Sequence, residues 1–418
     1  MDKQRIKQIL IKALDEVKPE KIIKKKIKFE KDILFVNNKK FFLKNYKNIY
    51  LCGSGKASIQ MAKALKSILG LRLKAGIIIS NFEDYIDKIE VLKGSHPIPD
   101  ESSLKSTEKL CDFLKNMDTN DFFIYLLSGG TSAMLEIMPE NVSLADLKNF
   151  TEILLKSGMT IQEMNVLRKK LSKVKGGKLL NYVNCNGICF VFSDVIGDDL
   201  RYIGSGPLYA GKDFIKPEEI LKKYNIENKI PENIKHHLLK KDKVIEKRKI
   251  PHFIIANNLT FLKTIQYLLK KELNLDAIVL TDSLKGEARE VAKVVVSLGK
   301  FQKKPLIFGG ETTVTVKGNG LGGRNQEMVL SALIELHNEK DFIFASIASD
   351  GIDGQSNAAG AIIDKYSIKK FKNLKLNPEN FLLNNDSYNF FKKIDDLIIT
   401  GKTGTNLLDA TFIYISDS

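Results

Sequence analysis

Short apolar segments alternate with segments of helical periodicity along most of the chain. In the first half, the pattern predicts strands over residues 49–52, 75–80, 122–127 and 188–192. It predicts helices over residues 57–69, 101–116, 144–157 and 161–171. Strands that are followed by a glycine-rich turn and then by a helix are typical of parallel α/β sheets.

The alternation stops over residues 216–249 and then resumes. No strand is apparent in this stretch, which is rich in Lys, helical and irregular, and contains Pro217 and Pro231; we expect it to be a connector. Beyond it the pattern predicts strands over 253–256, 277–280, 306–308, 312–317, 342–348, 397–399 and 413–415 and helices over 259–269, 287–298 and 325–336. Because 418 residues are too many for one ordinary core, we predict two α/β domains with mainly parallel sheets, over residues 1–240 and 250–418. The default place for the active site is the cleft between them.

The N-terminal residues 1–17 are charged throughout and have apolar side chains at helical spacing, which predicts an amphipathic helix rather than a secretory signal. No apolar run reaches the roughly 20 residues that span a bilayer, so we expect a cytoplasmic protein without a membrane partner. The four cysteines are scattered, and no second Cys or His pair completes a zinc site. We interpret them as buried thiols in a reducing compartment.

The formal net charge of +16 raises the question of nucleic-acid binding. The lysines are spread along the chain, however, and the densest runs contain neither interleaved aromatic residues nor a binding motif. A positive potential also favours a phosphorylated or carboxylate substrate. We therefore expect no nucleic-acid partner.

Residues 309–327 contain six glycines, and Arg324 stands at the start of the predicted helix. A glycine loop whose N–H groups lead into a helix forms an anion site, and a guanidinium adds a planar fork for phosphate or carboxylate. Gly318-x-Gly320-x-x-Gly323 also matches a dinucleotide fingerprint. Because the βαβ context is missing and Arg324 stands where the fingerprint needs close helix packing, we favour a phosphate nest.

Two further loops after predicted strands contain groups that bind anions. Gly53-Ser54-Gly55-Lys56-Ala57-Ser58 resembles the end of a P-loop, but Tyr50 stands where a Walker A motif has glycine. We interpret it as a phosphate-facing turn with Lys56 as the point charge; a tight turn with a surface lysine is the alternative. Ser128-Gly129-Gly130-Thr131-Ser132 offers hydroxyls to an anion, or an N-cap to the next helix.

Acidic side chains follow two other predicted strands. Ser193-Asp194-Val195-Ile196-Gly197-Asp198-Asp199 suits Mg²⁺ or a hydroxyl, with a solvated turn as the alternative. Ser349-Asp350-Gly351-Ile352-Asp353-Gly354 offers metal or general-base positions, with an Asp-Gly turn as the alternative. Phosphoryl transfer needs a phosphate cradle, a cation, a metal ligand and a base. The loops together therefore predict a site for a polyanion, Mg²⁺ and a small polar substrate.

Taken together, these motifs resemble the class II glycerate kinases, the family with a C-terminal MOFRL domain. The resemblance runs from about Tyr50 to the C-terminus and also includes His96-Pro97-Ile98-Pro99, Asn165 with Arg168, Lys175-Gly176-Gly177, Ser205-Gly206-Pro207 and Thr403-Gly404-Thr405-Asn406. It implies a Rossmann-like larger N-terminal domain, a MOFRL-type C-terminal domain, and phosphorylation of D-glycerate to 2-phosphoglycerate by ATP with Mg²⁺ or another divalent cation. It leaves a homodimer open.

The resemblance implies that Lys56, Arg324 and Asp350 are catalytic. In our hypothesis Lys56 binds phosphate or the substrate carboxylate, Arg324 neutralises the transferring phosphoryl group, and Asp350 accepts the hydroxyl proton or holds Mg²⁺. The expected substrate and phosphate contacts are Ser54, Gly55, Ser128, Gly129, Gly130, Ser132 and Asn325. The expected nucleotide contacts are Gly309, Gly310, Glu311, Thr312, Gly320, Gly322 and Gly323. The expected metal ligands are Asp194, Asp198 and Asp353.

The chain departs from the family pattern at Lys170, where we expect His, and at Leu208, Lys402 and Leu408. Lys170 keeps a cation but is no proton shuttle near neutral pH. Two other classes of function stay open. The glycine fingerprint suggests an oxidoreductase of the hydroxypyruvate reductase type, and the charge suggests a non-catalytic protein that binds a sugar acid and nucleic acid.

Overall fold

The computed structural model describes residues 2–240 and 249–416, and the chain divides into two compact units. The N-terminal unit spans Ile23–Ile255, and the C-terminal unit combines Met1–Ile22 with Ala256–Ser418. This division differs from the expected domains, 1–240 and 250–418, at both ends. The first residues of the chain belong to the C-terminal unit, and residues 250–255 belong to the N-terminal one.

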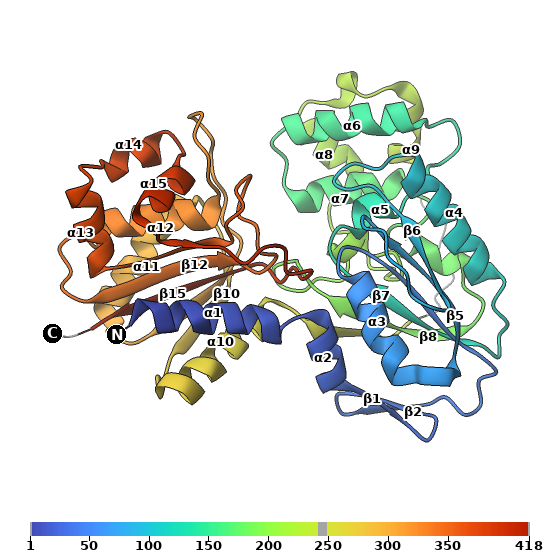
Figure 1. Cartoon of the computed structure of the whole chain (residues 1–418). Helices are drawn as coiled ribbons and strands as arrows, with labels where there is room; N and C mark the ends of the chain where they lie inside the picture. Colours follow the sequence, from blue (N-terminus) through green and yellow to red (C-terminus); the bar gives the residue numbers. More distant parts are fainter. Residues whose placement is uncertain (1, 241–248, 417–418) are drawn as a thin grey trace. The chain divides into compact units, whose positions relative to one another are not determined.

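Helix α1 (Lys3–Glu16) belongs to the C-terminal unit because its apolar face is buried there. Its buried apolar residues are Ile6, Ile9, Leu10, Ala13 and Leu14. The helix lies beside α10 (Asn258–Leu273), as Figure 1 shows. The buried Lys3 Nζ lies 2.8 Å from Asp396 Oδ1 and 3.2 Å from Asp364 Oδ1. The predicted amphipathic helix is confirmed, whereas its partner, far away in sequence, could not be predicted from local periodicity.

The N-terminal unit is built on a six-stranded sheet with the order β6-β5-β4-β7-β8-β9. Its strands are β4 (Ile49–Ser54), β5 (Leu73–Ser80), β6 (Ile89–Lys93), β7 (Phe122–Leu127), β8 (Asn186–Phe192) and β9 (His252–Ala256). Strand β4 pairs in parallel with both β5 and β7, and the pairs β5–β6 and β7–β8 are parallel as well. The chain therefore runs from β4 to one edge and then returns to β7. The carboxyl ends of β4 and β7 flank this switch point, where open α/β sheets bind ligands.

Two predicted helices of this unit are confirmed, α3 (Ser58–Leu69) after β4 and α4 (Glu101–Lys115) after β6. The short α5 (Thr131–Met134) after β7 was not predicted. The chain enters the unit through α2 (Pro19–Lys26) and an antiparallel sheet of β1 (Ile27–Glu30), β2 (Ile33–Val36) and β3 (Lys39–Phe42), which the pattern did not predict.

The described part of the expected connector packs onto two predicted helices. The predicted helices are α6 (Leu144–Lys156) and α7 (Ile161–Lys170), and the connector contributes α8 (Pro217–Lys223) and α9 (Glu232–Leu239). Ile220, Leu221, Ile234 and Leu238 are buried in the shared apolar core of these helices. The Lys-rich stretch is therefore folded up to residue 240, because its few apolar side chains lie on one side of each helix. The remaining part of the expected connector, residues 241–248, lies outside the described residues.

The C-terminal unit contains a second six-stranded sheet with the order β10-β11-β15-β12-β13-β14. Its strands are β10 (Ile278–Leu284), β11 (Leu306–Gly310), β12 (Phe342–Ala348), β13 (Gly360–Asp364), β14 (Leu397–Ile398) and β15 (Asp409–Ile415). Strands β10 and β11 are parallel, whereas β15 is antiparallel to both β11 and β12. Parallel pairing thus dominates the first sheet, and antiparallel pairing dominates the second because the last strand inserts between β11 and β12.

Residues 312–317, all within the described part of the chain, do not form the expected strand. Strand β11 ends at Gly310, and Thr313 makes an isolated bridge with Glu287. The Glu287 carboxylate also accepts the backbone N–H of Thr315 at 2.7 Å. The segment therefore runs along the start of α11 (Ala288–Gln302) instead of extending the sheet.

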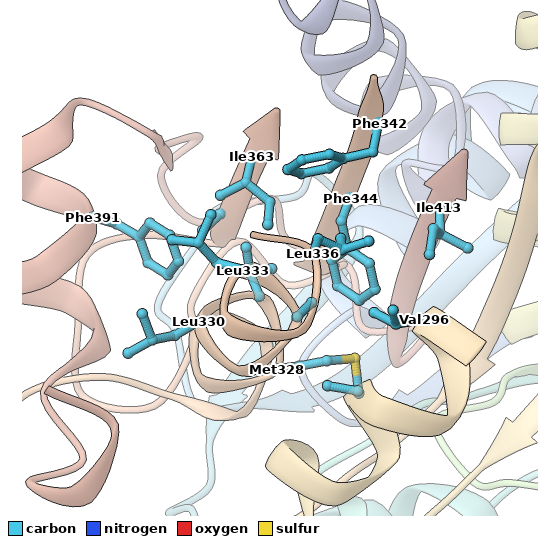
Figure 2. Packing of buried hydrophobic residues seen from close by; sticks show 14 of the residues in the cluster. Val296, Met328, Leu330, Leu333, Leu336, Phe342, Phe344, Ile363, Phe391 and Ile413 are labelled. Carbon is cyan, nitrogen blue, oxygen red and sulfur yellow. The ribbon is translucent and has the colours of Figure 1, made fainter. Parts of the chain in front are cut away.

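The core of the C-terminal unit lies between this sheet and helix α12 (Arg324–Glu335), which confirms the helix predicted over residues 325–336. Figure 2 shows Leu336 beside Phe344 of β12, whereas Leu330 and Leu333 lie toward Phe391. Alternate residues of a strand point to the same face, so this face of β12 is covered by α12. Three further helices complete the unit, namely α13 (Lys365–Asn373), α14 (Pro378–Leu383) and α15 (Ser387–Ile394).

The four cysteines, all within the described residues, are buried thiols outside any disulfide, as expected. Burial raises the pKa of the Cys111 thiol to about 12, so this side chain is unreactive near neutral pH. Among the helices of the described residues, none has the length and apolar character needed to cross a bilayer.

Candidate active site

The loops after β4 and β7 lie against each other at the switch point of the N-terminal sheet. The Lys56 backbone N–H donates to the Gly129 carbonyl at 2.9 Å, and the Ala57 N–H donates to Ser128 Oγ at 3.1 Å. Gly55 has a φ of +116°, and a Cβ there would lie 2.3 Å from Ser128 Oγ. The close approach of the loops therefore requires glycine. It places Lys56 beside the glycine turn that follows β7.

Ser54, an expected phosphate contact, is buried beneath these loops. Its Oγ lies 2.8 Å from the Tyr125 hydroxyl and 3.1 Å from Thr131 Oγ1. Thr131 Oγ1 donates in turn to the Ser128 carbonyl at 2.8 Å. Burial raises the pKa of Tyr125, so its hydroxyl stays protonated. Ser54 therefore supports the two loops from inside instead of facing a ligand.

The side chains of Lys56 and His96 both lie against Gly130. A Cβ at Gly130 would be 3.2 Å from Lys56 Cγ and 3.2 Å from His96 Cδ2. Burial, together with the charge of Lys56, lowers the pKa of His96 to about 4, so the imidazole is neutral near neutral pH. Within residues 2–240 and 249–416, the Lys56 ammonium makes no hydrogen bond or ion pair, which leaves it for a ligand.

Ser132 belongs to a cluster of polar side chains from three segments. Its Oγ lies 2.8 Å from Ser205 Oγ, and Ser205 Oγ donates to Asn165 Oδ1 at 2.9 Å. Ser205 has a φ of +62°, a left-handed conformation that is strained for a serine. The strand-end pattern identified Ser132, but Ser205 and Asn165 entered only through the family resemblance.

The acids expected to bind metal in this unit have different surroundings. Asp194 lies against the glycine turn, since a Cβ at Gly129 would be 1.8 Å from Asp194 Oδ2. Asp198 lies in the next turn with a φ of +54°, and its N–H donates to the Val195 carbonyl at 3.0 Å. In the part of the chain that the structure describes, no three His, Cys, Asp or Glu side chains are grouped so that they could hold a metal ion. Because Mg²⁺ often uses one or two carboxylates plus substrate phosphates, Asp194 suits a metal that arrives with a nucleotide.

In the C-terminal unit, Arg324 is held by two carboxylates. Its Nε and Nη2 donate to Asp409 Oδ2 at 2.5 Å and Oδ1 at 3.1 Å, and its Nη1 lies 2.8 Å from Glu311 Oε1. Burial lowers the pKa of Arg324, but the two carboxylates outweigh burial and the net effect is a raised pKa. Burial raises the pKa of Asp409 to about 6, although Arg324 opposes this shift.

Asp409, which holds Arg324, is a residue that the sequence pattern missed. It opens β15 and is paired in register with Gly310 of β11 and with Ala348 of β12. Since β15 runs antiparallel to both neighbours, its first residue lies at the edge where they end. The pattern predicted a strand only over residues 413–415, so the acid at its start gave no signal.

Asp353, an expected metal ligand, caps helix α12 instead. Its Oδ1 accepts the Asn325 N–H at 3.0 Å and Asn325 Nδ2 at 3.2 Å. Its Oδ2 accepts the Gln326 N–H at 2.8 Å and Gln326 Nε2 at 2.9 Å. The carboxylate is buried and fully hydrogen-bonded, so it does not fit a metal ligand. It also occupies the first N–H groups of the helix, including that of Asn325, an expected anion contact.

The glycine run before α12 packs on the segment 384–387. A Cβ would lie 2.3 Å from the Asn384 carbonyl oxygen at Gly318, 2.3 Å from Asp386 Cβ at Gly320 and 2.2 Å from Ser387 Oγ at Gly322. The Gly320 N–H donates to the Asn384 carbonyl at 2.9 Å, and the Leu321 N–H donates to Asp386 Oδ1 at 2.8 Å. At Gly323, a Cβ would meet Asp353 Oδ1 at 2.4 Å. Close packing therefore accounts for these glycines, three of which are expected nucleotide contacts.

The glycines at the end of β11 line a small pocket. Gly309, Gly310 and Thr312 surround a space of about 10 Å³ together with Asn325 and Asp409. Such a volume admits one water molecule, so a nucleotide would have to lie outside it.

Asp350 lies in a loop that contacts residues 400–404. A Cβ at Gly351 would be 2.0 Å from the Gly401 carbonyl oxygen, and the Thr403 N–H donates to the Asp350 carbonyl at 3.1 Å. The half-buried Asp350 carboxylate accepts the Ile352 N–H at 3.0 Å. Its second oxygen accepts no hydrogen bond from another described residue and is free for a ligand.

Comparison with known proteins places this geometry in a family. Residues 5–239 match a family described as a domain of unknown function (DUF4147), and residues 304–409 match the MOFRL family. The chain is 38% identical to the D-glycerate 2-kinase of Thermotoga maritima, over 87% of this chain and 90% of that one. It is 35% identical to the glycerate 2-kinase of Pyrococcus horikoshii, over 95% of this chain and 93% of that one.

A solved structure agrees with this assignment. The crystal structure of the Thermotoga maritima glycerate kinase matches with a TM-score of 0.86 at 36% identity, and the match covers 99% of each chain. Both the sequence likeness and the shared fold thus extend over most of the chain. The chain therefore belongs to the glycerate 2-kinase family, whose C-terminal part here is a MOFRL domain.

Proposed function

We propose that this protein transfers the γ-phosphoryl group of ATP to the 2-hydroxyl of D-glycerate, giving 2-phosphoglycerate and ADP. The observation that supports this most strongly is the 38% identity to a D-glycerate 2-kinase over 87% of the chain. The position of Lys56 agrees with it, because an unpaired cation beside a glycine turn at a sheet switch point suits an anionic ligand.

In the N-terminal unit, Lys56 attracts the transferring phosphate. The backbone N–H groups of Gly129, Gly130 and Ser132 would complete this anion site, with the Ser132 hydroxyl facing the polar cluster. Ser54 and Gly55 act indirectly by holding the two loops together. The neutral imidazole of His96 adds no charge to the site and offers a hydrogen bond close to Lys56.

In the C-terminal unit, Asp350 is the proposed base. Its carboxylate takes the proton of the 2-hydroxyl as that oxygen bonds to the γ-phosphorus and the bond to the bridging oxygen of ADP breaks. Arg324 is oriented by Asp409 and Glu311, yet a guanidinium has five N–H groups, so it can still neutralise the phosphoryl group. The end of β11 and the start of β15 would contact the nucleotide. That the sites of the two units act together across a cleft remains a prediction, as do a homodimer and a cytoplasmic location.

A divalent cation would accompany the nucleotide phosphates. Asp194 beside the glycine turn fits such a metal, because a carboxylate oxygen is the ligand that Mg²⁺ prefers. The metal would offset phosphate charge during transfer. Asp353 takes no part, since four donors already occupy its oxygens.

The test is an assay of the purified chain with ATP, Mg²⁺ and D-glycerate, in which phosphorus NMR distinguishes 2-phosphoglycerate from 3-phosphoglycerate. We expect the 2-phosphate and one ADP for each product molecule. Formation of the 3-phosphate would contradict the regiochemistry, and absence of glycerate-dependent ADP would contradict the activity. Lys56→Met serves as the inactive control.

The structure gives the oxidoreductase alternative little support. In a dinucleotide fingerprint the glycines follow directly after a strand and approach a pyrophosphate. Here β11 ends at Gly310, and Gly318 and Gly320 lie against the segment 384–387. Oxidation of NADH by hydroxypyruvate in the absence of ATP would support the oxidoreductase alternative.

A further inference from the structure

A group of charged and polar side chains in the N-terminal unit has no role in the function proposed so far. Helix α7 presents Asn165 and Arg168, three residues apart and therefore on one face. The Asn165 side chain is bonded to Ser205, which in turn contacts Ser132 of the glycine turn. The group thus begins at the anion site and extends away from it.

The guanidinium of Arg168 lacks a partner. It makes no hydrogen bond or ion pair with another residue of the described ranges, 2–240 and 249–416, although it is half-buried. Burial lowers the pKa of Arg168, and only the nearby charge of Glu136 opposes this effect. A partly desolvated and unpaired guanidinium destabilises the ligand-free protein. Its position therefore points to an anionic ligand that pairs with it.

Two buried side chains beside Arg168 are also incompletely bonded. Glu136 is 3% exposed, and its Oε1 has no hydrogen-bond partner among the described residues, whereas its Oε2 is paired with the buried Lys175. Asn165 is 4% exposed and uses its Oδ1 for Ser205, while its Nδ2 donates to no described residue. An unused amide donor and an unused guanidinium on one helix face form a fork that matches a carboxylate.

The charges of the group favour a monoanion. Arg168 and Lys175 contribute two positive charges and Glu136 one negative charge, so the three side chains together carry one positive charge. Lys175 is fully enclosed and donates to the Leu135 carbonyl at 3.1 Å in addition to Glu136. Of the two cations, Arg168 is therefore the one that a ligand can reach.

The glycine turn connects Lys56 with the polar group. Lys56 lies against Gly130, and Ser132, two residues further on, contacts Ser205. A ligand that places a phosphate-accepting hydroxyl near Lys56 and a carboxylate at Arg168 is therefore a hydroxy acid.

We propose that Arg168 and Asn165 bind the carboxylate of the acceptor substrate and that Ser132 and Ser205 contact its hydroxyl groups. This inference rests on the proposed kinase activity, and it assigns the binding of the acceptor carboxylate to the N-terminal unit. The group selects 2-hydroxy monocarboxylates, and Lys56 is thereby left to the phosphate.

The experiment compares Arg168→Gln and Arg168→Lys with wild type, and with Lys156→Gln as an exposed control on α6. We expect Arg168→Gln to raise the KM for D-glycerate about 10- to 100-fold, because a hydrogen bond between two charged groups is lost. The KM for ATP should not change. Arg168→Lys should recover only part of the affinity, because an ammonium lacks the planar fork. The preference of wild type for D-glycerate over its neutral amide should be lost in Arg168→Gln.

Two further measurements distinguish carboxylate binding by Arg168 from a purely structural role. If Arg168 only supported the fold, Arg168→Gln would lower the Tm of the ligand-free protein; we expect an equal or higher Tm, because an unpaired buried cation is removed. An unchanged KM for D-glycerate, or an equal rise in both KM values, would overturn the proposal. Calorimetric titration of D-glycerate without ATP tests carboxylate binding by itself, so an inactive wild type that still binds glycerate through Arg168 would contradict the kinase and not the carboxylate binding.

Discussion

The guanidinium of Arg324 and the carboxylate of Asp409 form a two-point ion pair, with Nε–Oδ2 and Nη2–Oδ1 distances of 2.5 and 3.1 Å. Arg324 opens helix α12, and Asp409 opens strand β15, 85 residues later in the chain. The pair fixes the orientation of the cation to which we assign charge neutralisation. Loss of Asp409 should therefore affect activity through Arg324.

We expect Asp409→Asn to lower kcat and Arg324→Ala to lower it further. Loss of a cation that stabilises the transferring phosphoryl group costs about 10³-fold or more. Asp409→Asn keeps the shape of the side chain and leaves Glu311 as the carboxylate that pairs with Arg324, so a smaller loss, about 10-fold, is expected. Steady-state kinetics with saturating ATP and D-glycerate measures both.

Glu311→Gln is the matched control for this pair, because it removes the other and more exposed carboxylate of Arg324. We expect it to affect kcat less than Asp409→Asn does. The double variant Arg324→Ala/Asp409→Asn should be no worse than Arg324→Ala, since both changes act through one guanidinium. An additive loss in the double variant would contradict a positioning role for Asp409.

The raised pKa of Asp409 predicts a specific pH dependence of stability. Burial raises this pKa to about 6. The charge of Arg324 opposes the shift, and the charges of Asp353 and Glu311 add to it. In the unfolded chain an Asp has a pKa of about 3.9. Between these values the folded state binds a proton that the unfolded state has lost. The contribution of Asp409 to the free energy of unfolding is therefore complete below pH ~4 and is lost as the pH rises through about 6.

Urea unfolding of wild type and Asp409→Asn should reveal this dependence. The difference in the free energy of unfolding between the two proteins should favour wild type most at low pH and should decrease as the pH rises from about 4 to 7. Taking the difference removes the contributions of the other carboxylates. A difference that stays constant, or that grows with pH, would show that the pKa of Asp409 is not raised.

Lys56 and His96 should be coupled in titration. Burial is the main cause that lowers the pKa of His96 to about 4, and the charge of Lys56 is the second. Lys56→Met should therefore raise the pKa of His96 only in part, while it lowers kcat about 10²- to 10³-fold. NMR of the imidazole protons gives the pKa, and Lys63→Met on the helix that follows is the control that should change neither quantity.

The placement of the N-terminal candidate residues on two adjacent loops could be predicted from the sequence because it depends on local patterns. A buried strand followed by glycines and a helix specifies a loop at a strand end, and parallel pairing then brings the loops of β4 and β7 together. Lys56, Gly129 and Gly130 were recognised in this way. The burial of Ser54 was not, because its hydroxyl is enclosed by Tyr125 from the neighbouring strand.

The C-terminal site could be predicted only in part, because long-range packing determines it. The glycines at 318, 320 and 322 are needed where the loop contacts the segment 384–387, and no local pattern contains that contact. Asp409 reaches the site only because β15 inserts antiparallel between β11 and β12. Similarly, Asp353 and Asp350 look equivalent in the sequence. They differ only because Asp353 caps helix α12, which comes earlier in the chain.

Asp350 and Asp353 provide a final, matched comparison of two acids in one loop. Asp353→Asn should destabilise the protein by about 2–4 kcal/mol, because the amide cannot accept from all four donors at the start of α12 and leaves buried N–H groups unpaired. Asp350→Asn should leave the free energy of unfolding within about 1 kcal/mol, because its carboxylate is half-buried and accepts the Ile352 N–H. It should lower kcat about 10²-fold or more if Asp350 accepts the hydroxyl proton. Urea unfolding and steady-state kinetics on both variants separate the two effects, and the assignment fails if Asp353→Asn is inactive at full stability or if Asp350→Asn retains wild-type kcat.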